Sequence, residues 1–232
     1  MTTSLLERIL NLIAPRACAI CGKRLAPREE MICSTCNLDL PRTYQWQHPL
    51  DNEMAKAFWG RIPVERAAAW LYHHGGSQEA RIIYDLKYKG HREYGELMGK
   101  MLAKEIISSH FFEGIDAIVP VPLAKKRLRQ RGYNQSDEIA EGIHQVTGIP
   151  VWDNIVTRSS FSSSQTNKDR WERAENVEGL FQIRNSEQVK NHHLLLVDDI
   201  CTTGATLTAC AQALMKAGEV RFSLLTIDYA KN

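Results

Sequence analysis

Along most of the chain, short apolar runs alternate with longer segments in which apolar residues recur every three or four positions. The runs predict strands over residues 65–72, 116–122, 193–197 and 221–229. The longer segments predict helices over 77–90, 91–108 and 204–217, and a further helix that carries Ile139, Ile143 and Val146. Residues 193–197 (HLLLV) are continuously apolar, which is typical of a strand covered on both faces of a parallel sheet. We therefore expect an α/β fold with an open, mainly parallel sheet.

The first 60 residues depart from this alternation. Residues 5–13 are amphipathic and are followed by Pro15, which predicts a short helix packed on its own domain or, alternatively, one that binds a membrane surface or a partner. Residues 37–60 are typical of a linker with a short helix near 52–58. The sequence has no run of about 18 apolar residues. The N-terminus also lacks the basic start of a signal peptide, so we expect a cytoplasmic protein without membrane insertion.

Composition and charge narrow the class of protein. Of the 232 residues, 44% are apolar and 24% are charged, which is typical of a globular chain and excludes one that is disordered throughout. The 29 basic and 27 acidic residues leave a net charge of only +2. This balance argues against a protein that binds nucleic acid through uniform positive charge, but it leaves local basic stripes open.

Four of the six cysteines lie close together as two CxxC pairs, Cys18 with Cys21 and Cys33 with Cys36. Two such pairs on a short connector can surround one tetrahedral zinc ion, and four thiolates leave no position for water, so we expect a structural site. Two redox pairs or four unrelated thiols are the alternatives. The metal would organise about 40 residues that are too poor in apolar groups to fold alone. We accordingly predict two domains, a helix and zinc ribbon over 1–45 and an α/β domain over 46–232.

The second cluster of candidate chemistry follows the predicted strand at 193–197. Two adjacent carboxylates, Asp198 and Asp199, precede a small-residue turn and the start of a helix. Backbone amides and the helix dipole make such a turn an anion site, and Thr202, Thr203 and Thr206 add hydroxyl donors. The acids would repel a phosphate bound directly to them, so they suit hydroxyls or a magnesium ion about one sugar away. A phosphorylated ribose meets both demands, whereas the alternative is a helix-capping turn without a ligand.

These residues resemble the phosphoribosyl-pyrophosphate motif of type I phosphoribosyltransferases, in which an apolar strand, two acids and a Thr-Gly-x-Thr turn follow one another. Together with the four-cysteine segment, the whole chain resembles the ComF family, which is associated with natural competence and DNA uptake. Further matching segments are 86–90 (LKYKG), 127–136 (RLRQRGYNQS), and Gln165 with Arg170, Arg173 and Asn176. The resemblance implies a type I phosphoribosyltransferase sheet in the larger domain.

The resemblance also implies roles for individual residues. The 5′-phosphate would be held by the turn Thr202, Thr203, Gly204, Ala205 and Thr206. Asp198 and Asp199 would be the catalytic residues and would bind the ribose hydroxyls. A magnesium ion would bridge the sugar and the pyrophosphate. The loop after 119–122 (VPVP) would bind pyrophosphate or a nucleic-acid backbone, unless its charges form only a solvated face. Its cations, together with one on a neighbouring segment, are Lys125, Lys126, Arg127, Arg129, Arg131 and Lys87. The Ser-rich segment around 159–169, with Gln165, Arg170 and Arg173, would act as a lid or serve as a plain surface connection.

One position departs from a known branch of that family. Thr202 stands where 6-oxopurine phosphoribosyltransferases have an aspartate that acts on the purine, and a threonine cannot do that work at neutral pH. The acceptor therefore stays open. The resemblance implies a phosphoribosyltransferase-fold protein of DNA uptake that binds phosphoribosyl pyrophosphate with Mg²⁺ and transfers phosphoribose to an unknown acceptor. The alternatives are a non-catalytic factor that binds single-stranded DNA and uses phosphoribosyl pyrophosphate as a ligand or regulator, and a zinc-dependent module that contacts proteins of the uptake machinery.

Overall fold

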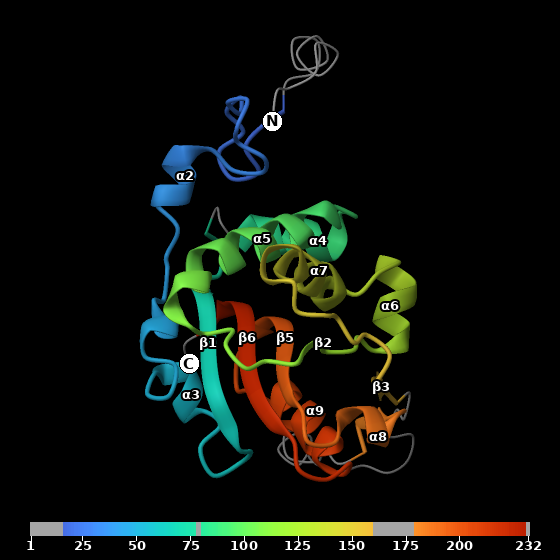
Figure 1. Cartoon of the computed structure of the whole chain (residues 1–232). Helices are drawn as coiled ribbons and strands as arrows, with labels where there is room; N and C mark the ends of the chain where they lie inside the picture. The colour runs from blue at the N-terminus through green and yellow to red at the C-terminus, as the bar shows by residue number, and fades with distance from the viewer. Residues whose placement is uncertain (1–15, 78–79, 160–178, 231–232) are drawn as a thin grey trace.

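The computed structural model describes residues 16–77, 80–159 and 179–230. Its centre is a parallel sheet in the order β1-β6-β5-β2 (Figure 1). These strands are β1 (Val64–Tyr72), β6 (Arg221–Tyr229), β5 (His193–Cys201) and β2 (Ala117–Pro120). A separate antiparallel pair is formed by β3 (Val156–Arg158) and β4 (Phe181–Ile183). The expected open, mainly parallel α/β sheet is confirmed.

Helices cover both faces of the sheet. The helices of the described residues are α2 (Ser34–Leu38), η1 (Gln45–Gln47), α3 (Glu53–Lys56), α4 (Ala80–Tyr88), α5 (Glu93–Ile106), η2 (Ile107–Ser109), α6 (Lys125–Arg131), α7 (Gln135–Thr147), α8 (Ser186–Val189) and α9 (Ala205–Met215). On β5, Leu195 and Val197 pack with α4, α5 and α7, whereas Leu194 and Leu196 pack with α3 and α9. Strand β5 is therefore buried on both faces, which explains its continuous apolar run.

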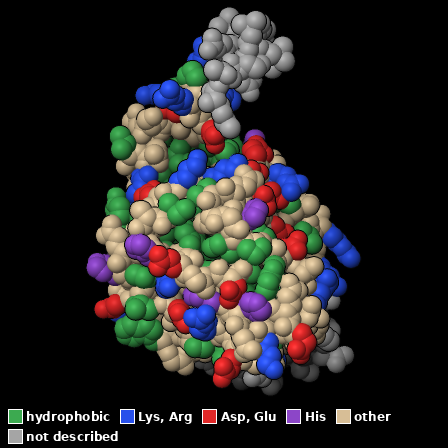
Figure 2. Space-filling model, viewed as in Figure 1, with side chains coloured by type: hydrophobic (Ala, Val, Ile, Leu, Met, Phe, Trp, Pro, Cys, Tyr) green, Lys and Arg blue, Asp and Glu red, His purple; other side chains and the backbone are tan. Residues whose placement is uncertain are grey.

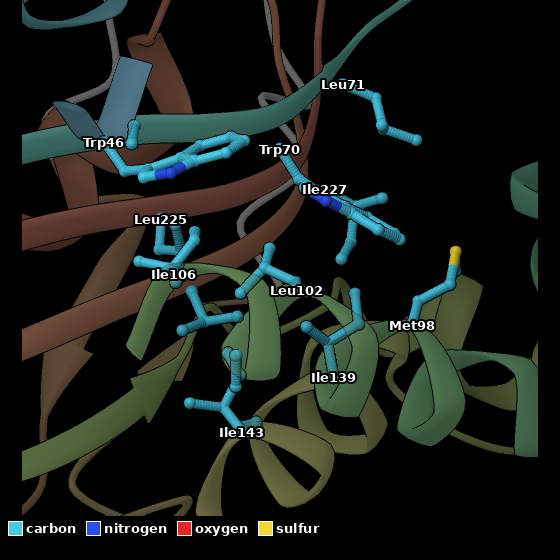
Figure 3. Packing of buried hydrophobic residues seen from close by; sticks show 14 of the residues in the cluster. Trp46, Trp70, Leu71, Met98, Leu102, Ile106, Ile139, Ile143, Leu225 and Ile227 are labelled. Atoms are coloured by element: carbon cyan, nitrogen blue, oxygen red, sulfur yellow. The ribbon is translucent and has the colours of Figure 1, made fainter. Parts of the chain in front are cut away.

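The larger apolar cluster fills the space between the sheet and helices α5 and α7 (Figure 3). Trp70 of β1 and Leu225 and Ile227 of β6 point toward these helices. The helices themselves meet at glycines: a Cβ at Gly99 would overlap the carbonyl oxygen of Ile139, and one at Gly142 that of Glu96. The backbones of α5 and α7 are therefore in direct contact. The first residues of α7 lie at the carboxyl end of β5, where Ser136 contacts Asp198.

The cysteine-rich segment packs on this same cluster. Its apolar side chains Leu25, Met31 and Ile32 are buried with those of α4 and α5. Arg42 ties the segment to the body of the molecule: its Nε donates to Glu105 Oε1 at 2.6 Å and its Nη1 to the carbonyl oxygen of Asn37 at 2.6 Å. The segment forms the upper lobe in Figure 2, where Lys and Arg side chains lie on its outer surface. The domain boundary at residue 45 stays a prediction.

Two local expectations need correction. The basic residues after β2 form helix α6 and not a loop: straight-chain Lys, Arg, Gln and Leu favour helix, and Gly132 ends it with a φ of 81°. Strand β5 continues to Cys201, so Asp198 and Asp199 lie in the strand itself. The amphipathic segment at 5–13 and the lid residues Gln165, Arg170 and Arg173 lie outside the described residues. Among the helices that the structure describes, none has the length and apolarity needed to cross a membrane.

Candidate functional site

Four cysteine sulfurs converge at the lobe. The Sγ atoms of Cys18, Cys21, Cys33 and Cys36 all lie within 4.8 Å of one another, and those of Cys21 and Cys33 are 3.8 Å apart. Tetrahedral Zn–S bonds of about 2.3 Å would place sulfurs roughly 3.8 Å apart. The backbone N–H of Cys33 donates to Cys18 Sγ at 3.3 Å, as amides do to metal-bound thiolates. The cluster can therefore hold a structural metal such as zinc.

The second site is a pocket of about 180 Å³ where β5 and β2 end and helix α9 begins. Open parallel sheets place ligands at the carboxyl ends of their strands, and this pocket lies there. It brings together the two acids of β5, one threonine of the following turn, one threonine at the start of α9, and cations from three separate elements. Its lining includes Asp198, Asp199, Thr202, Thr206, Lys87, Arg127, Arg131 and Arg158.

Asp198 is held by hydrogen bonds at one oxygen. Its Oδ1 accepts from Ser136 Oγ at 3.0 Å and from the backbone N–H of Asp199 at 2.9 Å. Burial, followed by repulsion from the Asp199 carboxylate, raises the pKa of Asp198 to about 7 despite these donors. The side chain therefore changes between its protonated and its charged form near neutral pH, and a bound cation would favour the charged form.

Asp199 has a different environment. Its Oδ2 lies 3.0 Å from Nζ of Lys87, which reaches it from helix α4, and the Asp199 side chain is 12% exposed. The two adjacent acids are therefore distinct: Asp199 is neutralised by a lysine, whereas Asp198 is hydrogen-bonded and protonatable. Lys87 also lies beside the pocket's basic side, so a bound anion could draw this lysine away from Asp199.

The turn after β5 is shaped by Gly204. Its φ of 73° is left-handed, and a Cβ there would lie 2.7 Å from the ring of Phe58 on the segment after α3. Arg61 donates from Nη1 to the carbonyl oxygen of Thr203 at 2.9 Å, which fixes the turn from outside. Thr202 and Thr206 line the pocket, and Ala205 starts helix α9. Contacts with Phe58 and Arg61 therefore hold this turn in place.

The predicted basic residues divide into two groups. Arg127 and Arg131 line the pocket from α6, as Lys87 does from α4. Arg131 is oriented by a 2.6 Å hydrogen bond from Nη1 to Gln135 Oε1 and by the Tyr88 ring, 5.1 Å away. Lys125, Lys126 and Arg129 belong to the same helix but are exposed outside the pocket lining. Only some of the cations can reach a ligand of the pocket.

Ser136, Asn134 and Arg158 line the pocket but were not predicted as site residues. Ser136, at the start of α7, supplies the donor to Asp198, and Asn134 donates from Nδ2 to the carbonyl oxygen of Val121 at 3.1 Å and so joins α7 to the end of β2. Arg158 enters from β3, above the ring of Phe181 at 5.4 Å, and burial lowers its pKa. Ser136 lies in a segment that carried the family resemblance, whereas no signal in the sequence pointed to Arg158.

Comparisons with known proteins agree with this geometry. Residues 95–226 match the family model of the phosphoribosyl transferase domain. Over 141 residues the chain is 30% identical to DNA utilization protein YhgH of Escherichia coli, covering 59% of this chain and 61% of that protein. It is 35% identical to competence protein F of Haemophilus influenzae, with 44% and 45% covered, and 32% identical to competence protein ComFC of Bacillus subtilis, with 44% and 39% covered. The chain thus spans less than two thirds of the length of these relatives.

Proposed function

The chain belongs to the phosphoribosyl transferase domain family and, within it, to ComF, and from this premise we propose that the pocket binds phosphoribosyl pyrophosphate with Mg²⁺. The observation that carries the proposal is the single lining shared by Asp198, Asp199, Thr202, Thr206, Arg127 and Arg131. Two acids, hydroxyl donors and two arginines within one pocket suit a ligand that bears hydroxyls between two anionic groups. We further propose that the protein acts in the cytoplasm in the handling of DNA during uptake.

Each part of such a ligand has a partner in the pocket. The 5′-phosphate would meet the Thr202–Thr206 turn at the start of α9, where the helix dipole favours an anion. The ribose hydroxyls would donate to Asp198 and Asp199. The pyrophosphate would lie against Arg127 and Arg131, whose fixed fork geometry suits phosphate oxygens.

A magnesium ion fits this donor set because hard cations prefer carboxylate, hydroxyl and phosphate oxygens. When bound, it supplies positive charge that stabilises the departing pyrophosphate. The residues of the chain would position the sugar and neutralise the leaving group, which are the contributions that a reaction through a sugar cation requires. Transfer of the phosphoribosyl group to an acceptor is the activity we propose for this pocket.

Titration calorimetry with phosphoribosyl pyrophosphate and Mg²⁺ tests the binding proposal. We expect micromolar binding by the wild type and loss of at least tenfold in affinity in Arg131→Ala. Arg129→Ala is the matched control, because Arg129 lies on the same helix outside the pocket lining and is expected to leave affinity unchanged. No heat of binding at millimolar ligand would contradict the proposal, as would equal effects of the two variants.

A second candidate function is binding of single-stranded DNA. It is favoured by the exposed cations Lys125, Lys126 and Arg129, which form a basic face on α6 beside the pocket, and by the names of the relatives. Fluorescence anisotropy with an oligothymidine should show affinity that falls steeply with salt. The triple change of these cations to Ala should weaken binding while phosphoribosyl pyrophosphate binding persists. Unchanged DNA affinity would contradict this candidate.

A further inference from the structure

An ion pair inside the pocket joins helix α4 to strand β5. Lys87 lies in the last turn of α4, and its Nζ is 3.0 Å from Oδ2 of Asp199. The side chain of Lys87 is 17% exposed and that of Asp199 is 12% exposed, so water and salt screen the pair only weakly. The ammonium therefore occupies an oxygen of Asp199 that a sugar hydroxyl or a metal ion would otherwise use.

The same lysine lines a second cavity of about 710 Å³ beside the pocket. Its lining has four cations, Lys87, Lys89, Arg127 and Arg131, and the described residues that form it include no Asp or Glu. Three of these cations, Lys87, Arg127 and Arg131, also line the pocket, so the two cavities share a basic wall. An anion bound at this wall would compete with Asp199 for the ammonium of Lys87.

Lys87 differs from Arg131 of this wall in its freedom to move. Arg131 is held by its hydrogen bond to Gln135 and by the ring of Tyr88. A lysine carries a compact charge on a flexible four-carbon stem, whereas an arginine presents a rigid planar fork. The ammonium of Lys87 can therefore exchange Asp199 for a phosphate oxygen without a movement of α4.

From these contacts we propose that Lys87 makes the pocket selective for a sugar phosphate with a second anionic group at its anomeric carbon; this rests on the proposed function of the pocket. Without a ligand, the ammonium blocks Asp199 against hydroxyls and cations. When the pyrophosphate of phosphoribosyl pyrophosphate reaches the basic wall, Lys87 moves to it, and Asp199 becomes free to accept a ribose hydroxyl. Ribose 5-phosphate has the same hydroxyls and 5′-phosphate but offers Lys87 no new partner, so its binding must break the ion pair without compensation.

Calorimetry with these two ligands, each with Mg²⁺, tests the selectivity. In Lys87→Met we expect the affinity for phosphoribosyl pyrophosphate to fall about tenfold, because one charge-assisted hydrogen bond is lost. The affinity for ribose 5-phosphate should rise about threefold, because Asp199 no longer has to leave an ion pair. A ribose 5-phosphate affinity that is unchanged or lower in Lys87→Met would overturn the proposal.

Lys89→Met is the matched control for this comparison. Lys89 forms a similar pair with Asp85 at 2.9 Å and lines the second cavity, but it does not line the pocket. We expect both affinities to be unchanged in this variant. A rise in ribose 5-phosphate affinity as large as that of Lys87→Met would show a general effect of charge and would overturn the assignment to Lys87.

A double-mutant cycle with inorganic pyrophosphate, in the absence of Mg²⁺, tests the exchange of partners itself. Asp199→Asn releases Lys87, so we expect the affinity for pyrophosphate to rise about threefold in the wild-type background and to stay unchanged in the Lys87→Met background. Equal gains in both backgrounds would show only the loss of a negative charge near the anion and would overturn the exchange. Melting curves check that each variant folds, and Lys87→Gln, whose amide can still donate to Asp199, replaces Lys87→Met if that variant does not.

This cycle also separates the proposal from the proposed function of the pocket. A wild type that binds pyrophosphate but not phosphoribosyl pyrophosphate would contradict the proposed function, and the cycle would still decide whether Lys87 exchanges Asp199 for an anion. A wild type that binds no pyrophosphate at millimolar concentration would overturn the exchange.

Discussion

Asp198 lies between two hydrogen-bond donors and a second carboxylate, and its proton affinity reflects the balance among them. Ser136 and the amide of Asp199 favour the charged form, but burial and the charge of Asp199 outweigh both and raise the pKa to about 7. An acid with a higher pKa in the folded chain contributes stability below its unfolded pKa of about 4, and this stability is lost as the pH rises through about 7. Ionisation of Asp198 around physiological pH therefore lowers the free energy of unfolding.

Replacement of this charge should stabilise the protein. Asp198→Asn keeps an oxygen that accepts from Ser136 and Asp199 but cannot ionise. We expect its melting temperature to exceed that of the wild type by roughly 3 °C or more at pH 8, and by less at pH 5. Asp51→Asn, at an exposed acid paired with Lys56, should show no such pH dependence. If the difference in melting temperature between Asp198→Asn and the wild type is the same at pH 5 and at pH 8, the assigned pKa is contradicted.

Arg158 offers a second test at the residue scale. Its guanidinium is partly desolvated beside Phe181 and near the cation of Arg127, which lowers its pKa and favours a bound anion. We expect Arg158→Gln to lower the affinity for inorganic pyrophosphate about tenfold, as measured by calorimetry. This corresponds to the loss of one charge-assisted hydrogen bond of about 1.5 kcal/mol. Arg184→Gln, at an exposed arginine just after β4, is the control. Equal affinity in both variants would remove Arg158 from the anion site.

At the scale of elements, the contact between α5 and α7 positions the pocket. Helix α7 begins at Gln135, so its first turn supplies Ser136 to Asp198, and its place is set where Gly142 meets the backbone of α5 at Glu96. A methyl group at Gly142 cannot be accommodated by a side-chain rotation, since backbone lies opposite. The contact of α7 with α5 at Gly142 therefore helps to place Ser136 for its hydrogen bond to Asp198.

Gly142→Ala should separate these helices. Alanine favours helix by about 1 kcal/mol, but overpacking costs 1–3 kcal/mol or more, so we expect a net loss of about 2 kcal/mol in the free energy of unfolding. Urea unfolding measures it. Glu141→Ala, one residue away on the exposed face, should be near neutral. If Gly142→Ala instead raises the free energy of unfolding by about 1 kcal/mol, as the helix propensity of alanine alone would do, then α5 and α7 are not closely packed at Gly142.

The strength of the sequence prediction differed between elements for physical reasons. Strand β5 was predictable because a strand buried on both faces needs a continuous apolar run, and the cysteine cluster because tetrahedral coordination constrains spacing. Helix α6 was missed because it is exposed along its length, so it has propensity but no apolar period. Arg158 could not be predicted because its position depends on the pairing of β3 with β4, two strands of three residues each.

At the scale of the whole molecule, the cysteine segment and the α/β body share one hydrophobic cluster. Met31 and Ile32, just before the second cysteine pair, pack with α4 and α5, and α4 supplies Lys87 to the lining of the pocket. Arg42 adds a polar link, since its partner Glu105 also accepts from Trp70 Nε1 at 3.0 Å. A change at the cysteines can therefore reach the face of the sheet that carries Trp70.

Removal of the metal tests this connection. We expect one zinc per chain by elemental analysis, and a melting temperature several degrees lower after chelation, because without metal the segment loses the order that buries Met31 and Ile32. The tryptophan fluorescence should also shift, since Trp46 and Trp70 lie in the shared cluster. Zinc added back should restore both signals, and Cys36→Ser should reproduce the effect of chelation.

If chelation removes the zinc but changes neither signal, the segment is held by apolar packing alone and the metal is not coupled to the body. If it changes both, the stability of the phosphoribosyl transferase fold depends on the occupancy of a site outside the sheet.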